Sequence, residues 1–116
     1  MNEIQDYRMR TKRFALQIIN LYSRLPKATE AQVMGRQLLR SGTSVGAQLC
    51  EGLRAKSRTD LISKFEGCLQ ELEESKYWLE LLLESKVIEE SQAEPILLEI
   101  EELLKIFVVS VKNLKR

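Results

Sequence analysis

Apolar residues recur at alternating steps of three and four along most of this chain, and that spacing is the signature of helices with one apolar face. In the first segment the spacing predicts a helix that ends at Leu25, because Pro26 disfavours helical geometry in the residue before it. The apolar face of this helix would carry Tyr7, Thr11, Phe14, Ile18, Leu21 and Leu25.

A second helix is predicted from about Thr29 to Leu53. Thr29 with Gln32 three positions later resembles a capping box, in which side chains satisfy the free backbone donors at a helix start. The inward positions of this helix would be Met34, Leu38, Ser41, Val45 and Leu49.

Small residues replace good helix formers between Ser41 and Ala47 of this second helix. Two glycines in a helix interior cost roughly 2 kcal/mol relative to alanine, so some contact should offset that cost. Gly35, Gly42 and Gly46 fall on one side of the helix and would let a neighbouring helix approach closely. The alternative is that residues 41–47 form a loop that interrupts the helix.

A polar connection over residues 54–58 precedes a third helix of about 27 residues, or roughly 40 Å. Ser57 or Thr59 would be its N-cap, because a side-chain oxygen there can accept from the first backbone N–H groups. Its inward face would hold Leu61, Phe65, Cys68, Leu72, Leu79 and Leu82, with Ser75 as a polar interruption.

A turn over residues 85–88 leads to the fourth helix, which is predicted to begin between Glu89 and Ser91 and to tolerate Pro95 only within its first turn or so. Short connections make successive helices antiparallel. The sequence therefore predicts an all-α fold, an antiparallel up-down-up-down four-helix bundle, as one domain over residues 1–116. The inward face of the fourth helix would carry Ile96, Ile100, Leu103, Phe107, Val111 and Leu114.

The absence of histidine from all 116 residues excludes most catalytic and metal-binding arrangements. The chain lacks the usual general base, the commonest metal ligand and every Ser-His or Cys-His nucleophile. Glu66, Glu73, Glu99 and Glu102 cannot complete a Glu-x-x-His di-iron site and are expected on solvated faces or in ion pairs. We expect no enzyme, catalytic residue, metal, cofactor or small-molecule substrate. The lysines expected to pair with these glutamates are Lys64, Lys76 and Lys105.

Cys50 and Cys68 lack the spacing of a metal or redox motif and are predicted to be buried free thiols. No apolar run approaches the roughly 18 to 20 residues of a membrane span, and the polar start does not resemble a secretory signal. We expect a cytoplasmic protein that does not associate with membranes.

The net charge of +1 conceals a division along the chain. Residues 1–57 hold ten Lys or Arg against four Asp or Glu, whereas residues 58–116 hold eight against thirteen. A basic half and an acidic half could serve nucleic-acid binding or contact between copies of the protein. The alternative is that antiparallel helices pair these charges within the monomer.

Nucleic-acid backbones require only positive charge at suitable spacing, and the first half of the chain with the following turn supplies it. The chain has no zinc-finger spacing, no aromatic platform motif and only seven aromatic residues, so sequence-specific recognition is not expected. Tyr77 and Trp78 are expected to pack rather than to stack on bases. The candidate nucleic-acid-binding residues are Arg8, Arg10, Lys12, Arg13, Arg36, Arg40, Arg54, Lys56 and Arg58.

Glu51 and Arg54, three residues apart at the end of the second helix, are expected to pair on the surface or to take part in a subunit contact or in ending the helix. The candidates for subunit contact or close helix contact are Gly42, Gly46, Glu51 and Trp78.

Two segments also resemble a known family. Residues 39–52 (LRSGTSVGAQLCEG) have its pattern of an arginine, a small-residue segment and a closing Glu-Gly, and residues 54–57 (RAKS) follow. Residues 74–82 (ESKYWLELL) resemble its third-helix motif around Tyr-Trp-Leu-Glu. On these residues the chain is similar to bacterial four-helix-bundle proteins related to the ribosomal-RNA intervening-sequence proteins.

That resemblance implies a homopentamer, a barrel with a central passage, as in the related accessory variability proteins of diversity-generating retroelements. Those relatives bind nucleic acid and a reverse transcriptase through basic surface. The leading hypothesis is thus a non-enzymatic pentameric scaffold that contacts RNA, DNA or a nucleic-acid-handling partner. The alternative is a protein-interaction adaptor whose apolar groove receives a partner helix without any nucleic-acid function.

Overall fold

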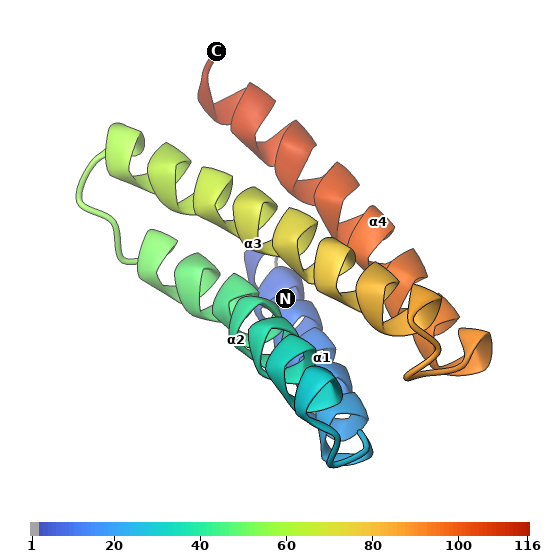
Figure 1. Cartoon of the computed structure of the whole chain (residues 1–116). Coiled ribbons are helices and arrows are strands. Elements are labelled where there is room, and N and C mark those ends of the chain that lie inside the picture. Colours follow the sequence, from blue (N-terminus) through green and yellow to red (C-terminus); the bar gives the residue numbers. More distant parts are fainter. Residues whose placement is uncertain (1–2) are drawn as a thin grey trace.

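Four long helices account for nearly all of the chain that the structure describes, residues 3–116, with side chains from Asp6 onward. In this computed structural model α1 spans Glu3–Ser23, α2 Thr29–Gly52, α3 Arg58–Glu84 and α4 Glu90–Leu114 (Figure 1). Short connections make successive helices antiparallel, so the predicted all-α up-down bundle is confirmed. Met1 and Asn2, which the predicted domain includes, lie outside the described residues.

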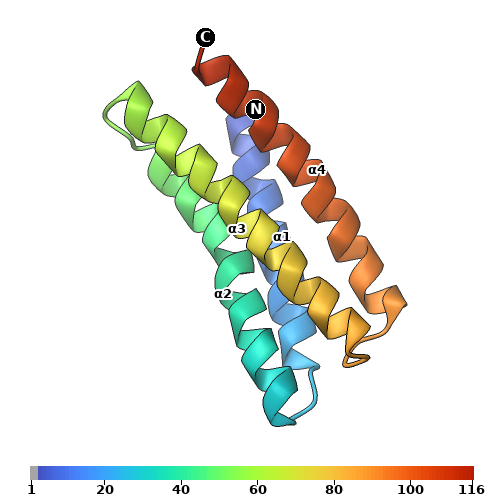
Figure 2. The ribbon, with the colours of Figure 1, turned by 45° about the horizontal axis from the view of Figure 1, so that its top comes forward.

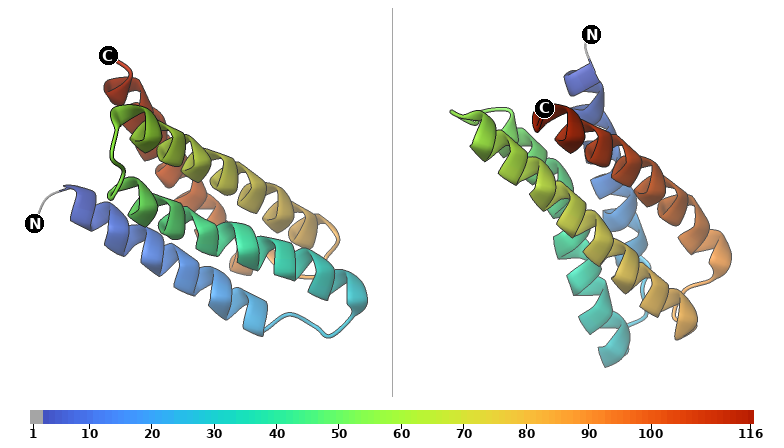
Figure 3. Two further views of the ribbon diagram at one scale, coloured as in Figure 1. Left: turned by 90° about the vertical axis from the view of Figure 1, so that its left-hand side faces the viewer. Right: turned by 90° about the horizontal axis from the view of Figure 1, so that it is seen from above.

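The helices form a rod of 45 × 22 × 22 Å (Figures 2 and 3). Neighbouring helices differ in how extensively they contact each other. α2 and α3 share the most extensive contact, whereas α1 and α4, which close the bundle, share the least. None of the helices within residues 3–116 combines the length and the apolar character that crossing a membrane requires.

The core is built from the inward faces that the three-and-four spacing predicts. Phe14, Leu38, Leu72 and Phe107, one from each helix, are fully buried. The predicted polar interruption is also buried: the Ser75 hydroxyl donates to Ser41 Oγ at 2.8 Å, and Ser41 donates in turn to the Leu38 carbonyl. Each hydroxyl therefore has a partner inside apolar surroundings, as burial of a polar group requires.

The small-residue segment remains helical, so the alternative of a loop over residues 41–47 is wrong. A Cβ atom added to Gly42 would lie 2.8 Å from Cγ1 of the buried Ile18, and one added to Gly46 would lie 3.2 Å from Thr11 Oγ1. The glycines thus let α1 approach α2, as predicted, and the close packing offsets their low helix propensity.

Two predicted helix ends differ from the structure. Thr29 is the first residue of α2 and forms no cap, and the Gln32 side chain instead donates to the Pro26 carbonyl at 2.7 Å. α1 ends at Ser23 rather than Leu25, because Arg24 and Leu25 already donate to carbonyls three residues back and the last turn tightens.

The starts of α3 and α4 agree better with the sequence. Ser57 caps α3 by accepting from the Asp60 N–H at 3.1 Å. Glu89 caps α4 in a capping box with Gln92. Pro95 is the sixth helical residue and so lies early in the second turn, close to the predicted limit of the first turn or so, where the Ser91 carbonyl loses its helical donor.

The turn between α3 and α4 depends on one residue in a left-handed conformation. Lys86 has φ 65°, while Val87 N–H bonds to the Leu82 carbonyl and Lys86 N–H to that of Leu83. These bonds make the Schellman ending, which reverses the chain and directs α4 back along α3.

The two cysteines have different environments. Cys68 is fully buried and its thiol donates to the Val45 carbonyl at 3.4 Å, as the prediction of a buried free thiol requires. Cys50 is exposed, so that prediction is wrong for it. Its position on the outer side of α2, one turn after Gly46, turns it away from the core.

Replacing the two α2 glycines by alanine should have unequal effects. Alanine gains about 1 kcal/mol of helix propensity at either position. At Gly42 the added methyl meets the stiff, buried Ile18, and overpacking of this kind costs about 1–3 kcal/mol. We therefore expect Gly42→Ala to lower the free energy of unfolding and Gly46→Ala to leave it within about 1 kcal/mol, as measured by urea denaturation. Equal effects would contradict the close approach at Gly42.

Cys68 should also make stability depend on pH. Burial raises the pKa of its thiol from 9.0 to about 12. Above pH 9 the unfolded chain releases this proton and the folded protein keeps it, so the free energy of unfolding should fall by up to about 1.4 kcal/mol per pH unit until the pH reaches the folded pKa. The measurement is the slope difference between wild type and Cys68→Ala, with Cys50→Ala as control. Parallel slopes would contradict this prediction.

Candidate nucleic-acid interface

Arg10 is held in an ion pair that joins α1 to α4. Its Nε and Nη2 donate to the two carboxylate oxygens of Glu99 at 2.8 and 2.9 Å, and both side chains are partly buried. These hydrogen bonds raise the pKa of Arg10. A bidentate pair of this kind fixes geometry as well as charge, so Arg10 is not free to bind phosphate.

Arg40 is likewise committed, here between α2 and α3. It donates to Glu71 at 3.3 Å and to Glu74, which also accepts from the Trp78 indole N–H. The hydrogen bond from Arg40 lowers the pKa of Glu74. Trp78 therefore acts inside this chain, beside the α2–α3 contact, and Tyr77 packs edge-to-face against it with ring centroids 5.1 Å apart.

Arg58 and Arg13 are separated from the other candidates. The Arg58 guanidinium donates to the Leu114 carbonyl at 3.1 Å and so binds the end of α4. Arg13 lies on the side of α1 that faces α4, where it lines a hollow of about 630 Å³ with Leu16 and Glu99. The sequence did not predict this hollow. It also grouped Arg13 with Lys12, although consecutive helical residues point about 100° apart and so face different neighbours.

Five predicted residues remain exposed and make no ion pair with residues 6–116. We call them the basic face. Arg8 and Lys12 lie on α1, and Arg36 lies on α2 seven residues before Thr43, on the same side of that helix. Arg54 and Lys56 lie in the connection that follows α2.

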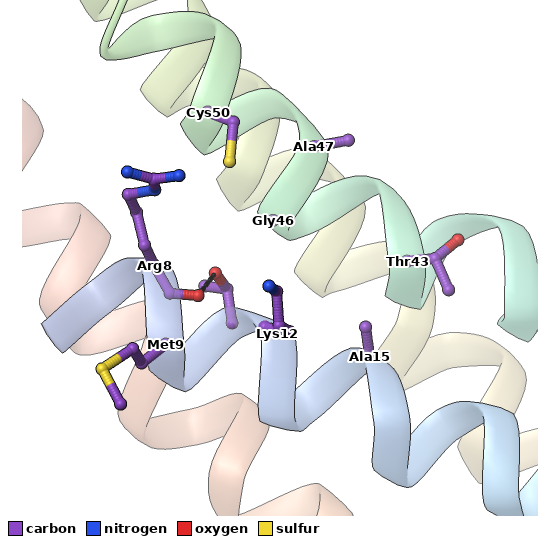
Figure 4. Close-up of a pocket in the computed structure, with 9 residues that line it drawn as sticks. Arg8, Met9, Lys12, Ala15, Thr43, Gly46, Ala47 and Cys50 are labelled. Atoms are coloured by element: carbon purple, nitrogen blue, oxygen red, sulfur yellow. Dashed lines mark hydrogen bonds between the residues drawn. The ribbon is translucent and has the colours of Figure 1, made fainter. Parts of the chain in front are cut away.

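A groove of about 480 Å³ runs between α1 and α2, and Arg8 and Lys12 of the basic face line it. Figure 4 shows Arg8 and Lys12 reaching from α1 toward α2, with the Cys50 sulfur pointing back toward α1. The α2 side of the groove offers only small side chains, among them Gly46 and Ala47. Small residues therefore produce both the close contact between α1 and α2 and the groove on the outer side of that contact.

The chemistry of the groove suits an anion with oxygen acceptors. Arg8 offers a planar fork of N–H donors and Lys12 a mobile point charge, and both side chains can reach an extended phosphate chain. The Thr11 hydroxyl beneath them is already used, because it donates to the carbonyls of Tyr7 at 2.8 Å and Arg8 at 3.1 Å. Any ligand would thus be held by the two cations rather than by the floor.

The predicted contact residues act within the chain in this structure. Gly42 and Gly46 lie at the α1–α2 crossing. Glu51 pairs with Lys64 at 3.0 Å rather than with Arg54, so the expected local pair is wrong. The reason is that Lys64 lies opposite the end of α2, on the first turns of α3, while Arg54 follows the helix end.

Of the ten basic residues in residues 1–57, only Arg10 and Arg40 pair with carboxylates of the second half. The alternative that antiparallel helices pair their charges within the monomer therefore holds only in part. The acidic half mostly pairs with its own lysines: Lys76 with Glu101, Lys105 with Glu102, and Lys115 with Glu66. Among residues 6–116 no three His, Cys, Asp or Glu side chains gather as a metal site would require.

Comparisons with known proteins found both a family and a similar solved structure. The family model for 23S rRNA-intervening sequence proteins matches residues 5–108. A crystal structure from Bacteroides thetaiotaomicron VPI-5482, described as a protein of unknown function from the S23 ribosomal protein family, is 37% identical in sequence. That match covers 96% of this chain and 99% of the other, with a TM-score of 0.89. A search of curated proteins found no match.

The Arg10–Glu99 pair should contribute measurably to stability, since it spans the least extensive helix contact. In a double-mutant cycle with Arg10→Ala and Glu99→Ala, we expect a coupling energy of about 0.5–1 kcal/mol that shrinks with added salt. Lys105 and Glu102, exposed and 3.8 Å apart, provide the control pair and should show a coupling close to zero. Equal coupling in the two pairs would contradict a special role for Arg10.

Proposed function

This chain belongs to the 23S rRNA-intervening sequence protein family, and from that premise we propose that it is a non-enzymatic scaffold that binds nucleic acid through its basic face. The scaffold would consist of identical copies, five in number by the resemblance to accessory variability proteins of diversity-generating retroelements. The basic face carries the proposal because its five cations lack carboxylate partners among residues 6–116, while the cations nearest the acidic half are paired.

The mode of binding follows from the side chains that line the groove. Arg8 and Lys12 can neutralise successive phosphates, and Arg36 extends the positive charge along α2. No aromatic side chain lines the groove, and Tyr77 and Trp78 lie on α3. Stacking on bases is therefore not part of the proposal, and binding should follow the backbone with little regard to base sequence.

Assembly would strengthen weak binding by each copy. One basic face has few cations, but a ring repeats it at fixed spacing, so that a long nucleic acid bound at one face meets the next at high local concentration. The non-enzymatic part of the proposal rests on the absence of histidine from the sequence. A nucleic-acid-handling protein that presents its own phosphate-like acidic surface would fit the same face.

The alternative function, an adaptor for a partner helix, is favoured by one observation. The same α1–α2 groove has small residues along its α2 side and Met9, 49% exposed, at its α1 side. A helix with an apolar face and acidic flanks could lie there. Such a partner would depend on the shape of the groove more than on Arg36, which lies outside its lining.

Charge reversal on the basic face tests the proposal. We expect wild type to bind fluorescein-labelled RNA and DNA in an anisotropy titration, with affinity falling at least tenfold between about 50 and about 200 mM salt. The triple variant Arg8→Glu, Lys12→Glu, Arg36→Glu should lose at least about tenfold in affinity at low salt. The matched control reverses Lys86, Lys105 and Lys112, which changes the net charge equally on the other side of the bundle.

Equal losses in both triple variants would show that net charge, and not the basic face, determines binding. No binding of either nucleic acid by wild type at low salt would reject the nucleic-acid function. The scaffold part is separate: sedimentation should give a mass of about five chains of 13.4 kDa, and a monomer at micromolar concentration would reject it.

A further inference from the structure

The outer side of α1 carries apolar side chains that the monomer leaves uncovered. Leu16 is 57% exposed and Met9 is 49% exposed, and seven residues separate them, so both lie on one line along the helix. Arg13, exposed, stands between them on the side toward α4. We call Met9, Arg13 and Leu16 the α1 stripe. It faces away from the buried line of Phe14 and Ile18.

α4 carries a second uncovered line. Leu98 is 61% exposed and Val109 is 55% exposed, and their separation of eleven positions amounts to three helical turns. Glu102, one turn after Leu98, lies on the same line and pairs with Lys105 at 3.8 Å. We call Leu98, Glu102 and Val109 the α4 stripe. Leu16 and Leu98 are the two most exposed leucines of residues 6–116.

The surroundings of the two leucines have opposite charge. Leu16 lies one turn from Arg13, which pairs with no carboxylate among residues 6–116. Leu98 lies one turn from Glu94 and Glu102, both exposed. An apolar contact between these stripes would therefore bring unlike charges together around its edge, which favours the correct pairing and speeds encounter.

The two stripes also lie at the same level of the bundle. Leu16 lines the hollow between α1 and α4 together with Pro95, three residues before Leu98, and Glu99, the residue after it. In a closed ring, successive copies are related by rotation without translation along the axis. With the ring axis along the bundle, the two surfaces that meet must lie at the same level, and Leu16 shares the hollow with Glu99, the residue after Leu98.

We propose that the α1 stripe of one copy packs head-to-tail against the α4 stripe of the next, with Leu16 beside Leu98 and Arg13 near Glu102. This inference rests on the self-association in the proposed function and names the surfaces that produce it. Because the two surfaces differ, each copy contacts one neighbour through its α1 stripe and the other neighbour through its α4 stripe. The same contact therefore repeats around a ring.

A two-fold contact across the whole α1–α4 side fits the structure less well. The centre of that side is the hollow of about 630 Å³, whose lining includes Gln17, Asn20 and Glu99. A symmetric pair would cover these polar groups together with the hollow, at a cost in unsatisfied hydrogen bonds. The outer sides of two neighbouring helices in a four-cornered bundle point roughly 90° apart, which suits a head-to-tail ring of about four or five copies.

Two variants that each destroy one surface provide the test. Leu16→Glu disables the α1 stripe and Leu98→Glu the α4 stripe, and both residues are exposed enough for the fold to tolerate the change, which circular dichroism verifies. Val33→Glu on α2, where Val33 is 47% exposed, is the matched control. By sedimentation we expect wild type and Val33→Glu to form the full assembly and each stripe variant alone to be monomeric.

Mixing the two stripe variants distinguishes head-to-tail contact from two-fold contact. One chain then supplies an intact α1 stripe and the other an intact α4 stripe, so the mixture should give a one-to-one dimer and nothing larger. If either variant alone kept the wild-type mass, or the mixture gave no dimer or a larger species, the assignment of these surfaces would be overturned. A monomeric wild type would overturn it together with the scaffold, whereas loss of nucleic-acid binding alone would leave it intact.

Cysteine crosslinking detects the same contact even if one interface is weak. In a Cys50→Ser background, a Leu16→Cys chain mixed with a Leu98→Cys chain should form a disulfide-linked dimer on oxidation, since the contact would bring the two thiols together. Neither chain alone should do so, and a Val33→Cys chain mixed with the Leu98→Cys chain is the control. Absence of the mixed dimer, or equal yield in the control, would overturn the proposal.

Discussion

The close approach of α1 to α2 is the contact on which the remaining surface features depend. Gly42 and Gly46 remove the side chains that would hold the two helices apart, and Ile18 and Thr11 occupy the space. The same small residues leave a shallow groove on the outer side, bordered by Arg8 and Lys12. A helix with larger residues in this segment would move α1 outward, and both the core contact and the groove would change together.

The distribution of charge follows from which helices are neighbours. α2 lies between α1 and α3, so Arg40 can reach the carboxylates of α3, and α1 meets α4 only along a thin contact, where Arg10 finds Glu99. Arg8, Lys12 and Arg36 pair with no carboxylate among residues 6–116. Antiparallel packing therefore pairs charges at the helix boundaries and leaves the middle of the α1–α2 side positive.

Sequence reasoning predicted the fold well because helical periodicity reports which side of a helix is buried. It placed Phe14, Leu72 and Phe107 in the core and even identified Ser75 as a buried polar residue. It predicted the site less well, since periodicity does not say which neighbour an exposed side chain meets. Arg10 and Arg40 look like Arg8 and Arg36 in sequence, and only the placement of Glu99 and Glu74 in space separates them.

The buried hydrogen bond between Ser41 and Ser75 has a consequence for the assembly as well as for the core. Because the two hydroxyls meet in only one position of α3 along α2, the bond between them favours that position. Short connections join α3 to α4 and α1 to α2, so a shift of α3 along the bundle carries α4 with it, and a shift of α2 carries α1. A slip of one turn, about 5.4 Å, would offset Leu98 from Leu16 by that amount. Repeated around successive copies, such an offset turns a closed ring into an open helical filament.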